Sequence, residues 1–249
     1  MFARWTYCFI VFCSLIFSDA FSQTNKVAKN GSNLQNNPLK SVEFNQLDQR
    51  KNQNISLIVQ PVLIMLDPGH GGHDAGTQSI SKPRYQEKSL NLATAQFVKT
   101  YLLQKGYKVM MTRETDVFVS LEKRAQLANQ KKPTLFVSIH FNAAPSINAK
   151  GVEVFYYESK EKKERTTKSK KLAQALLKQV LAHTQAKSRG VKQGNYAVIR
   201  ETNIPAVLIE GGFVTNEEEL KQLKDPIYLK RLAWGITRGI EEYLAKNKQ

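Results

Sequence analysis

Cysteine is almost absent from this sequence of 249 residues. Its two cysteines, Cys8 and Cys13, both lie within the first 22 residues, and the rest of the chain has none. Downstream of that segment the composition therefore excludes a disulfide framework and thiolate metal ligands. The sequence has only 4 histidines, so any metal would have to be held by His and carboxylate side chains.

Acidic residues are also scarce, because 21 Asp and Glu stand against 37 Lys and Arg, which gives a formal net charge of +16. Such a charge favours polyanionic partners, and anionic lipid or an acidic cell-envelope polymer suits an exported protein better than nucleic acid does. The alternative is that many lysines are simply solvated charges on helix faces. We expect no nucleic-acid partner, since no motif of interleaved aromatic and basic residues is present.

The amino-terminal segment has the features of a secretory signal. Arg4 precedes a nearly continuous apolar stretch at 5–17, and Ala20-Phe21-Ser22 resembles a cleavage site. We predict a signal peptide over residues 1–22, because the apolar stretch is too short to span a bilayer comfortably. The expected location is the periplasm or cell envelope, with no transmembrane segment after cleavage.

Residues 23–61 are rich in Asn, Gln, Ser and Lys without an apolar period, which predicts a disordered polar linker. From Val62 onward, short apolar runs alternate with segments of helical period. This alternation predicts one α/β domain over 62–249, with a largely parallel mixed sheet of five or six strands and helices on both faces. We expect the protein to be a monomer. The expected strands are 62–66, 107–111, 134–139, 152–157 and 206–209, and the expected helices are 89–104, 121–128, 168–183 and 227–244.

Four acidic or imidazole side chains occur where a strand ends or a loop enters a helix: His70, Glu87, His140 and Glu210. The carboxyl ends of parallel strands share one edge of a sheet, so these side chains can converge there. Two histidines and one carboxylate form a ligand set typical of catalytic zinc, and a further carboxylate can move the proton of a water molecule. The spacing does not decide which glutamate has which role.

Each of these residues also has a purely structural interpretation. Glu87 alone is typical of a carboxylate at a helix start, whereas Glu210 ends an apolar strand, where an unpaired charge is costly unless it faces a site. His183 lies inside an amphipathic helix and is expected to be a packing residue. His73 follows a glycine turn, where a solvated side chain is the more common case.

Several motifs together resemble the zinc-dependent N-acetylmuramoyl-L-alanine amidases of bacterial cell walls, the amidase-3 type. The resemblance covers nearly all of 62–244. It rests on four motifs in order, DPGHGG with His70, the Glu87-Lys88 pair, SIHFNA with His140 and PAVLIEGGFVTN with Glu210, supported by MTRETD at 111–116, Arg124, GVEVFYY at 151–157 and RGVKQGNYAVIR at 189–200.

The resemblance implies that His70, Glu87 and His140 bind one Zn²⁺ per chain and that Glu210 is the catalytic carboxylate. The implied reaction on peptidoglycan is cleavage of the amide between the lactyl group of N-acetylmuramic acid and L-alanine of the stem peptide. Cell-wall remodelling or daughter-cell separation is the implied role. The loop after His140 is short, at 143–150, so we expect no autoinhibitory helix over the site.

Two further residues are candidates for supporting roles. Asn142 is expected to contact the substrate or a metal ligand, or else to form a turn. Asp67 is expected to orient His70 through the free ring nitrogen, as metal-bound histidines require, or else to cap the turn. The rival functions are a zinc peptidase acting on stem peptides, which the same ligand set suits, and a non-catalytic envelope-binding protein.

Overall fold

The computed structural model describes residues 62–247, so the predicted signal peptide and the whole of the predicted linker lie outside the described residues. The strands are β1 (Leu63–Pro68), β2 (Lys108–Met111), β3 (Leu135–Asn142), β4 (Val152–Tyr156), β5 (Ser188–Gln193) and β6 (Ala206–Phe213). The helices are α2 (Glu87–Gln104), α3 (Leu121–Lys131), α4 (Lys163–Thr184), α5 (Ala197–Arg200), α6 (Glu217–Leu223) and α7 (Pro226–Lys246).

The six strands form one sheet in the order β2-β1-β3-β6-β4-β5. Strands β2, β1, β3 and β6 run parallel to one another, whereas β4 is antiparallel to β6 and parallel to β5. The predicted α/β fold with a largely parallel, mixed sheet is therefore confirmed.

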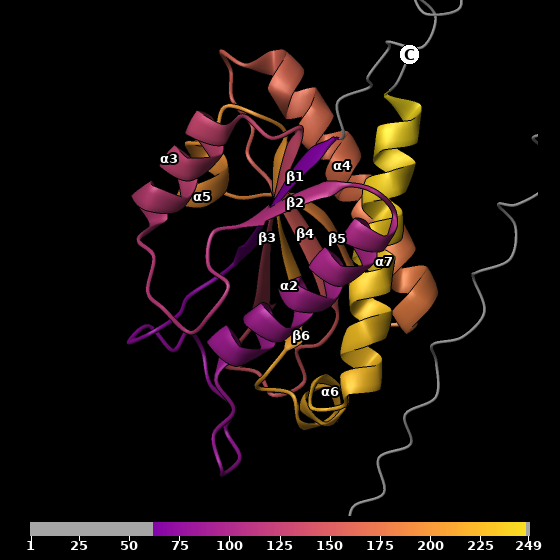
Figure 1. The fold of residues 1–249 in the computed structure, drawn as a ribbon. Helices are drawn as coiled ribbons and strands as arrows, with labels where there is room; N and C mark the ends of the chain where they lie inside the picture. The colour runs from indigo at the N-terminus through magenta and orange to yellow at the C-terminus, as the bar shows by residue number, and fades with distance from the viewer. Residues whose placement is uncertain (1–61, 248–249) are drawn as a thin grey trace, which may run out of the picture. The chain divides into compact units, whose positions relative to one another are not determined.

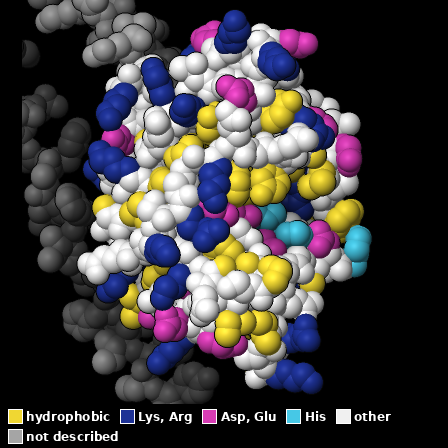
Figure 2. All heavy atoms as spheres, turned by 180° about the vertical axis from the view of Figure 1, so that it is seen from behind, with side chains coloured by type: hydrophobic (Ala, Val, Ile, Leu, Met, Phe, Trp, Pro, Cys, Tyr) yellow, Lys and Arg dark blue, Asp and Glu magenta, His cyan; other side chains and the backbone are white. Residues whose placement is uncertain are grey.

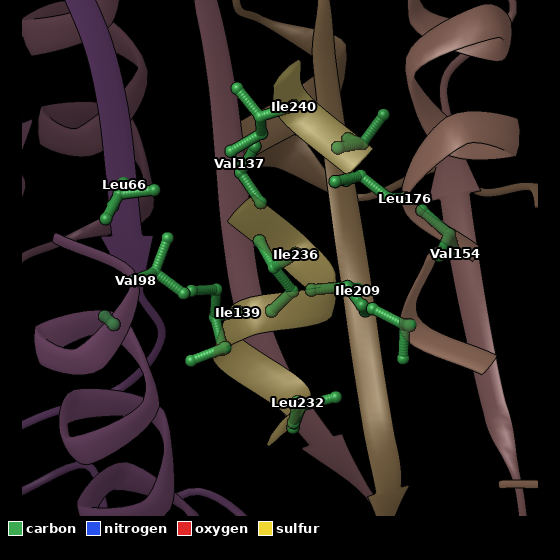
Figure 3. Packing of buried hydrophobic residues seen from close by; sticks show 14 of the residues in the cluster. Leu66, Val98, Val137, Ile139, Val154, Leu176, Ile209, Leu232, Ile236 and Ile240 are labelled. Carbon is green, nitrogen blue, oxygen red and sulfur yellow. The ribbon is translucent and has the colours of Figure 1, made fainter. Parts of the chain in front are cut away.

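Helices cover both faces of this sheet, with α2, α4 and α7 on one face and α3 and α5 on the other (Figure 1). Successive side chains of a strand point to opposite faces, and the central strands supply apolar residues to both. In β3, Val137 and Ile139 pack with α2 and α7 (Figure 3), whereas Phe136 belongs to the smaller cluster on the α3 and α5 face. Within residues 62–247, none of the helices has the length and apolar character needed to cross a membrane.

The principal differences from the sequence prediction lie at the ends of elements and in the shortest ones. Strands β3 and β6 continue to Asn142 and Phe213, so His140 and Glu210 lie inside their strands rather than at the last residue. Helix α2 begins at Glu87 instead of Ser89. The predictions omitted β5, α5 and α6, which are short or half-exposed and therefore lack a clear apolar period.

Candidate metal centre and cleft

His70 lies in a tight, glycine-rich turn that follows β1 at the edge of the sheet. Its backbone adopts the left-handed conformation, with φ of 59°, which is uncommon for a residue other than glycine. The preceding Gly69 is required by the packing, since a Cβ there would lie 2.0 Å from Cε1 of His140. Gly76 is confined in the same way, because its Cβ would lie 2.6 Å from Oε2 of Glu87.

Glu87 lies between the two histidines and contacts both. Its Oε2 lies 3.1 Å from Nε2 of His70, and its Oε1 lies 2.8 Å from Nδ1 of His140. Backbone N–H groups of Thr77 and Phe141 also donate to this carboxylate, at 2.9 and 3.2 Å. Burial opposes ionisation, but the hydrogen bonds and charges of the two imidazoles hold the pKa of Glu87 well below its usual range.

The three side chains together form a group able to hold a metal ion. One ligand atom from each of His70, Glu87 and His140 lies within 4.8 Å of the others. The outer nitrogen of His70, Nδ1, is 2.8 Å from Oδ2 of Asp74. Burial alone would lower the pKa of His70, but the Glu87 and Asp74 carboxylates raise it. A carboxylate behind a histidine fixes the ring orientation and tautomer that metal binding needs.

Glu210 lies beside this group in the neighbouring strand. Its Cα is paired with that of His140 in the β3–β6 register and with that of Glu153 in the β4–β6 register. The side chain is buried, and its Oε2 has no hydrogen-bond partner among the described residues. Burial, with the nearby charges of Glu87 and Glu153, raises the pKa of Glu210 well above its usual value.

A cleft of about 420 Å³ opens over these residues. Figure 2 shows the same region from outside, where histidine and acidic side chains lie in a hollow with hydrophobic side chains around it. The cleft is lined by the four predicted site residues and Asn142, by Thr77, Phe141, Ala143 and Leu208, by Leu121 at the start of α3, and by Tyr196, Ala197 and Val198 at α5.

Asn142 lines the cleft, and both the nitrogen and the oxygen of its side-chain amide form hydrogen bonds within the protein. Its Nδ2 donates to Oε1 of Glu153 at 2.8 Å, and its Oδ1 accepts from the backbone N–H of Ala143 at 2.8 Å. Glu153 is itself buried and is paired with Arg189 and Lys192. The sequence reasoning missed Glu153, although a lone acidic residue in the apolar run of β4 signals a buried polar contact.

The prediction that Asp67 orients His70 is wrong. The Asp67 carboxylate is fully buried and accepts hydrogen bonds from Arg124, Thr112 and Ser138 at 2.6 to 2.7 Å. The reason is the strand period, which points Asp67 toward α3 and its Arg124. The carboxylate that contacts Nδ1 of His70 is that of Asp74, four residues along the same loop, and the sequence analysis did not single it out.

The remaining histidines lie apart from this group, in agreement with their expected roles. His183 of α4 has its Nδ1 2.7 Å from the carbonyl oxygen of Gln179, one turn earlier in the helix. His73 is exposed and its ring lies 4.2 Å from that of Phe118, measured between centroids.

Comparison with known proteins identifies the family of this chain. Residues 64–242 match the Amidase_3 profile, described as N-acetylmuramoyl-L-alanine amidase. The chain belongs to this amidase family. A probable cell wall amidase, LytH of Staphylococcus epidermidis, is 36% identical over 182 residues, which cover 73% of this chain and 58% of that relative. The chain thus spans somewhat more than half the length of that curated relative.

Solved structures of family members share the fold as well. An N-acetylmuramoyl-L-alanine amidase from Clostridium difficile 630 superposes with a TM-score of 0.71 at 37% identity, covering 76% of this chain and 99% of that one. The catalytic domain of CwlV, an amidase from Bacillus (Paenibacillus) polymyxa var. colistinus, gives 0.68 at 38% identity, covering 74% and 98%. Residues 64–242, which match the family profile, contain His70, Glu87, His140 and Glu210.

Proposed function

We propose that this protein is an exported zinc-dependent N-acetylmuramoyl-L-alanine amidase that hydrolyses peptidoglycan during cell-wall remodelling. The observation that carries the proposal is the convergence of His70, Glu87 and His140 beside a buried, unpaired Glu210 in one open cleft. Membership of the amidase family favours the bond between the lactyl group and L-alanine as the one that is cleaved.

The side chains of the metal-binding group fit zinc by their chemistry. Two imidazole nitrogens and one carboxylate are a set that leaves a further coordination position open, as catalytic zinc sites require. In the structure, Glu87 accepts hydrogen bonds from both imidazoles. Metal binding usually releases protons from its ligands, so a bound cation would take the place of the protons in these hydrogen bonds. When bound to these three side chains, zinc supplies a Lewis acid that polarises a carbonyl and acidifies water.

Glu210 is the residue suited to moving the proton. Its Oε2 is buried and has no hydrogen-bond partner within residues 62–247, so it can accept a proton from the attacking water and return it to the leaving amine of L-alanine. Its raised pKa brings the carboxyl closer to the range in which a general base and acid can work near neutral pH. Asp74 holds the ring of His70 from behind, so that Nε2 faces the other two ligands.

The test is mass spectrometry of the products formed when the purified protein digests intact peptidoglycan. We expect free stem peptides with new L-alanine amino termini, and their loss after chelation of the metal or in Glu210→Gln. Glu242→Gln is the matched control, because Glu242 lies on α7 in contact with Lys178 and Lys246, away from the cleft. Cuts within the peptide would instead assign a zinc peptidase, and zinc binding without any product would assign a binding protein.

A further inference from the structure

Arg113 follows β2 and is 3% exposed, yet it is not used in the proposed reaction. Among residues 62–247, its guanidinium donates hydrogen bonds only to backbone carbonyl oxygens. Nε donates to Pro68 at 2.9 Å, Nη2 donates to Gly69 at 2.8 Å and to Lys88 at 2.9 Å, and Nη1 donates to Thr115 at 3.1 Å.

Two of these carbonyls belong to the segments that carry metal ligands. Gly69 immediately precedes His70, and Lys88 immediately follows Glu87 in the first turn of α2. One nitrogen, Nη2 of Arg113, therefore joins the loop after β1 to the start of α2 at the point where their ligands must meet. The planar, forked donor set of arginine suits such bridging, whereas lysine has a single flexible ammonium group.

The loop that Arg113 holds needs external support. The left-handed conformation of His70 persists only where surrounding contacts determine it. Arg124 supplies one such contact, because its Nη2 donates to the carbonyl oxygen of His70 at 2.7 Å. Arg113 donates to the two preceding carbonyls, those of Pro68 and Gly69, which Arg124 and Asn91 respectively also contact. Arg113 also packs so close to the turn that a Cβ on Gly71 would lie 2.9 Å from its Cδ.

We propose that Arg113 is a positioning residue that sets the separation between His70 and Glu87 and thereby the affinity of the site for zinc. The inference rests on the proposed metal site. It assigns a role to the MTRETD motif, in which no residue touches the metal-binding group directly through a side chain. Arg113 forms no salt bridge with a carboxylate among residues 62–247, so its contribution is the geometry of these hydrogen bonds.

The experiment is a titration of the metal-free protein with zinc in competition with a chromophoric chelator. Arg113→Gln and Arg113→Lys are compared with the unmodified protein. We expect zinc to bind about 10- to 100-fold more weakly in both, which is the usual effect of removing a supporting contact behind a metal ligand. The lysine variant keeps the charge and most of the side-chain volume. If the glutamine variant does not fold, the zinc affinity of the lysine variant is the test of the inference.

Arg165→Gln is the matched control, since Arg165 is also a buried arginine that donates to backbone carbonyls. Its Nη1 donates to the carbonyl oxygens of Ile199 and Thr202, and neither residue is next to a proposed metal ligand in the sequence. We expect this variant to lose stability and keep its zinc affinity. Circular dichroism of the metal-free proteins establishes that each variant is folded.

Each outcome of the titration has a distinct meaning. A folded Arg113→Lys protein with unchanged zinc affinity would overturn the inference and leave the metal site in place. Equal weakening in the Arg113 and Arg165 variants would also overturn it, because the effect would then reflect general stability. An unmodified protein that binds no zinc would overturn the proposed metal site and this inference together.

Discussion

Replacing Gly69 with alanine is the smallest change that we expect to remove a metal ligand. The added Cβ would lie 2.0 Å from Cε1 and 2.1 Å from Nε2 of the His140 ring. Ordinary contact begins at 3.4 Å, so the ring and the loop must separate by about 1.4 Å. Metal–ligand distances tolerate only about 0.2 Å. The displacement is several times larger, and His140 can no longer bind together with the other two ligands.

The size of the effect follows from this geometry. Loss of a contact behind a ligand typically weakens metal binding about 10- to 100-fold, and loss of the ligand itself exceeds that. We therefore expect Gly69→Ala to weaken zinc binding by more than about 100-fold in chelator competition. The proposed hydrolysis of peptidoglycan should be lost in parallel at limiting zinc.

The control for Gly69→Ala is Gly106→Ala, at the far end of α2. Gly106 has a φ of 82°, so alanine is strained there, but its Cβ would meet nothing within 4 Å. This variant loses stability without touching the site and keeps its zinc affinity. If a folded Gly69→Ala protein bound zinc within about tenfold of the unmodified protein, His140 would not be a ligand in the position described.

Three further substitutions separate the metal site from the fold. Asp74→Asn should weaken zinc binding about 10- to 100-fold by removing the carboxylate behind His70, and chelator competition measures this. Asp67→Asn breaks the buried pair with Arg124 and should cost about 3–5 kcal/mol in urea unfolding at pH 7. Burial opposes the charge of Asp67, but Arg124 and the hydrogen bonds lower its pKa below 3.8, so its contribution is complete above pH 3.8 and declines as the pH falls further. Gly239→Ala should destabilise the protein by about 1–3 kcal/mol in the same assay, because its Cβ would lie 2.6 Å from a backbone carbon of α4, while zinc affinity stays unchanged.

Much of the fold could be predicted because its long elements are strongly patterned. Apolar runs predict the buried central strands, and helices as long as α4 and α7 show a helical period. The sheet order and the reversed direction of β4 could not be predicted, since strand periodicity carries no information about which strands pair. The short α5 was missed because its four residues are fixed by tertiary contacts of Val198 and Ile199 rather than by local preference.

The candidate site was predictable to the extent that its residues interrupt apolar patterns. Glu210 was found because a carboxylate in a buried strand requires an explanation. Asp74 and Arg113 were not found, because both lie in polar loops where charged residues are ordinary. Asp67 was given the wrong partner for a related reason: its neighbour in sequence is His70, but the strand period turns its side chain toward α3.

The position of the cleft follows from the unequal helices on the two faces of the sheet. Helices of 18, 22 and 21 residues, α2, α4 and α7, cover one face, and there the central strands present apolar side chains along their length. The other face has only α3 and α5, of 11 and 4 residues. Residues at the starts of both line the cleft. The strand period places Glu153, Glu210 and His140 side by side on this thinly covered face, and the side chains of Glu210 and His140 line the cleft. We therefore regard the short helices on this face, together with the glycine loop, as the feature that leaves the cleft over the proposed metal site open.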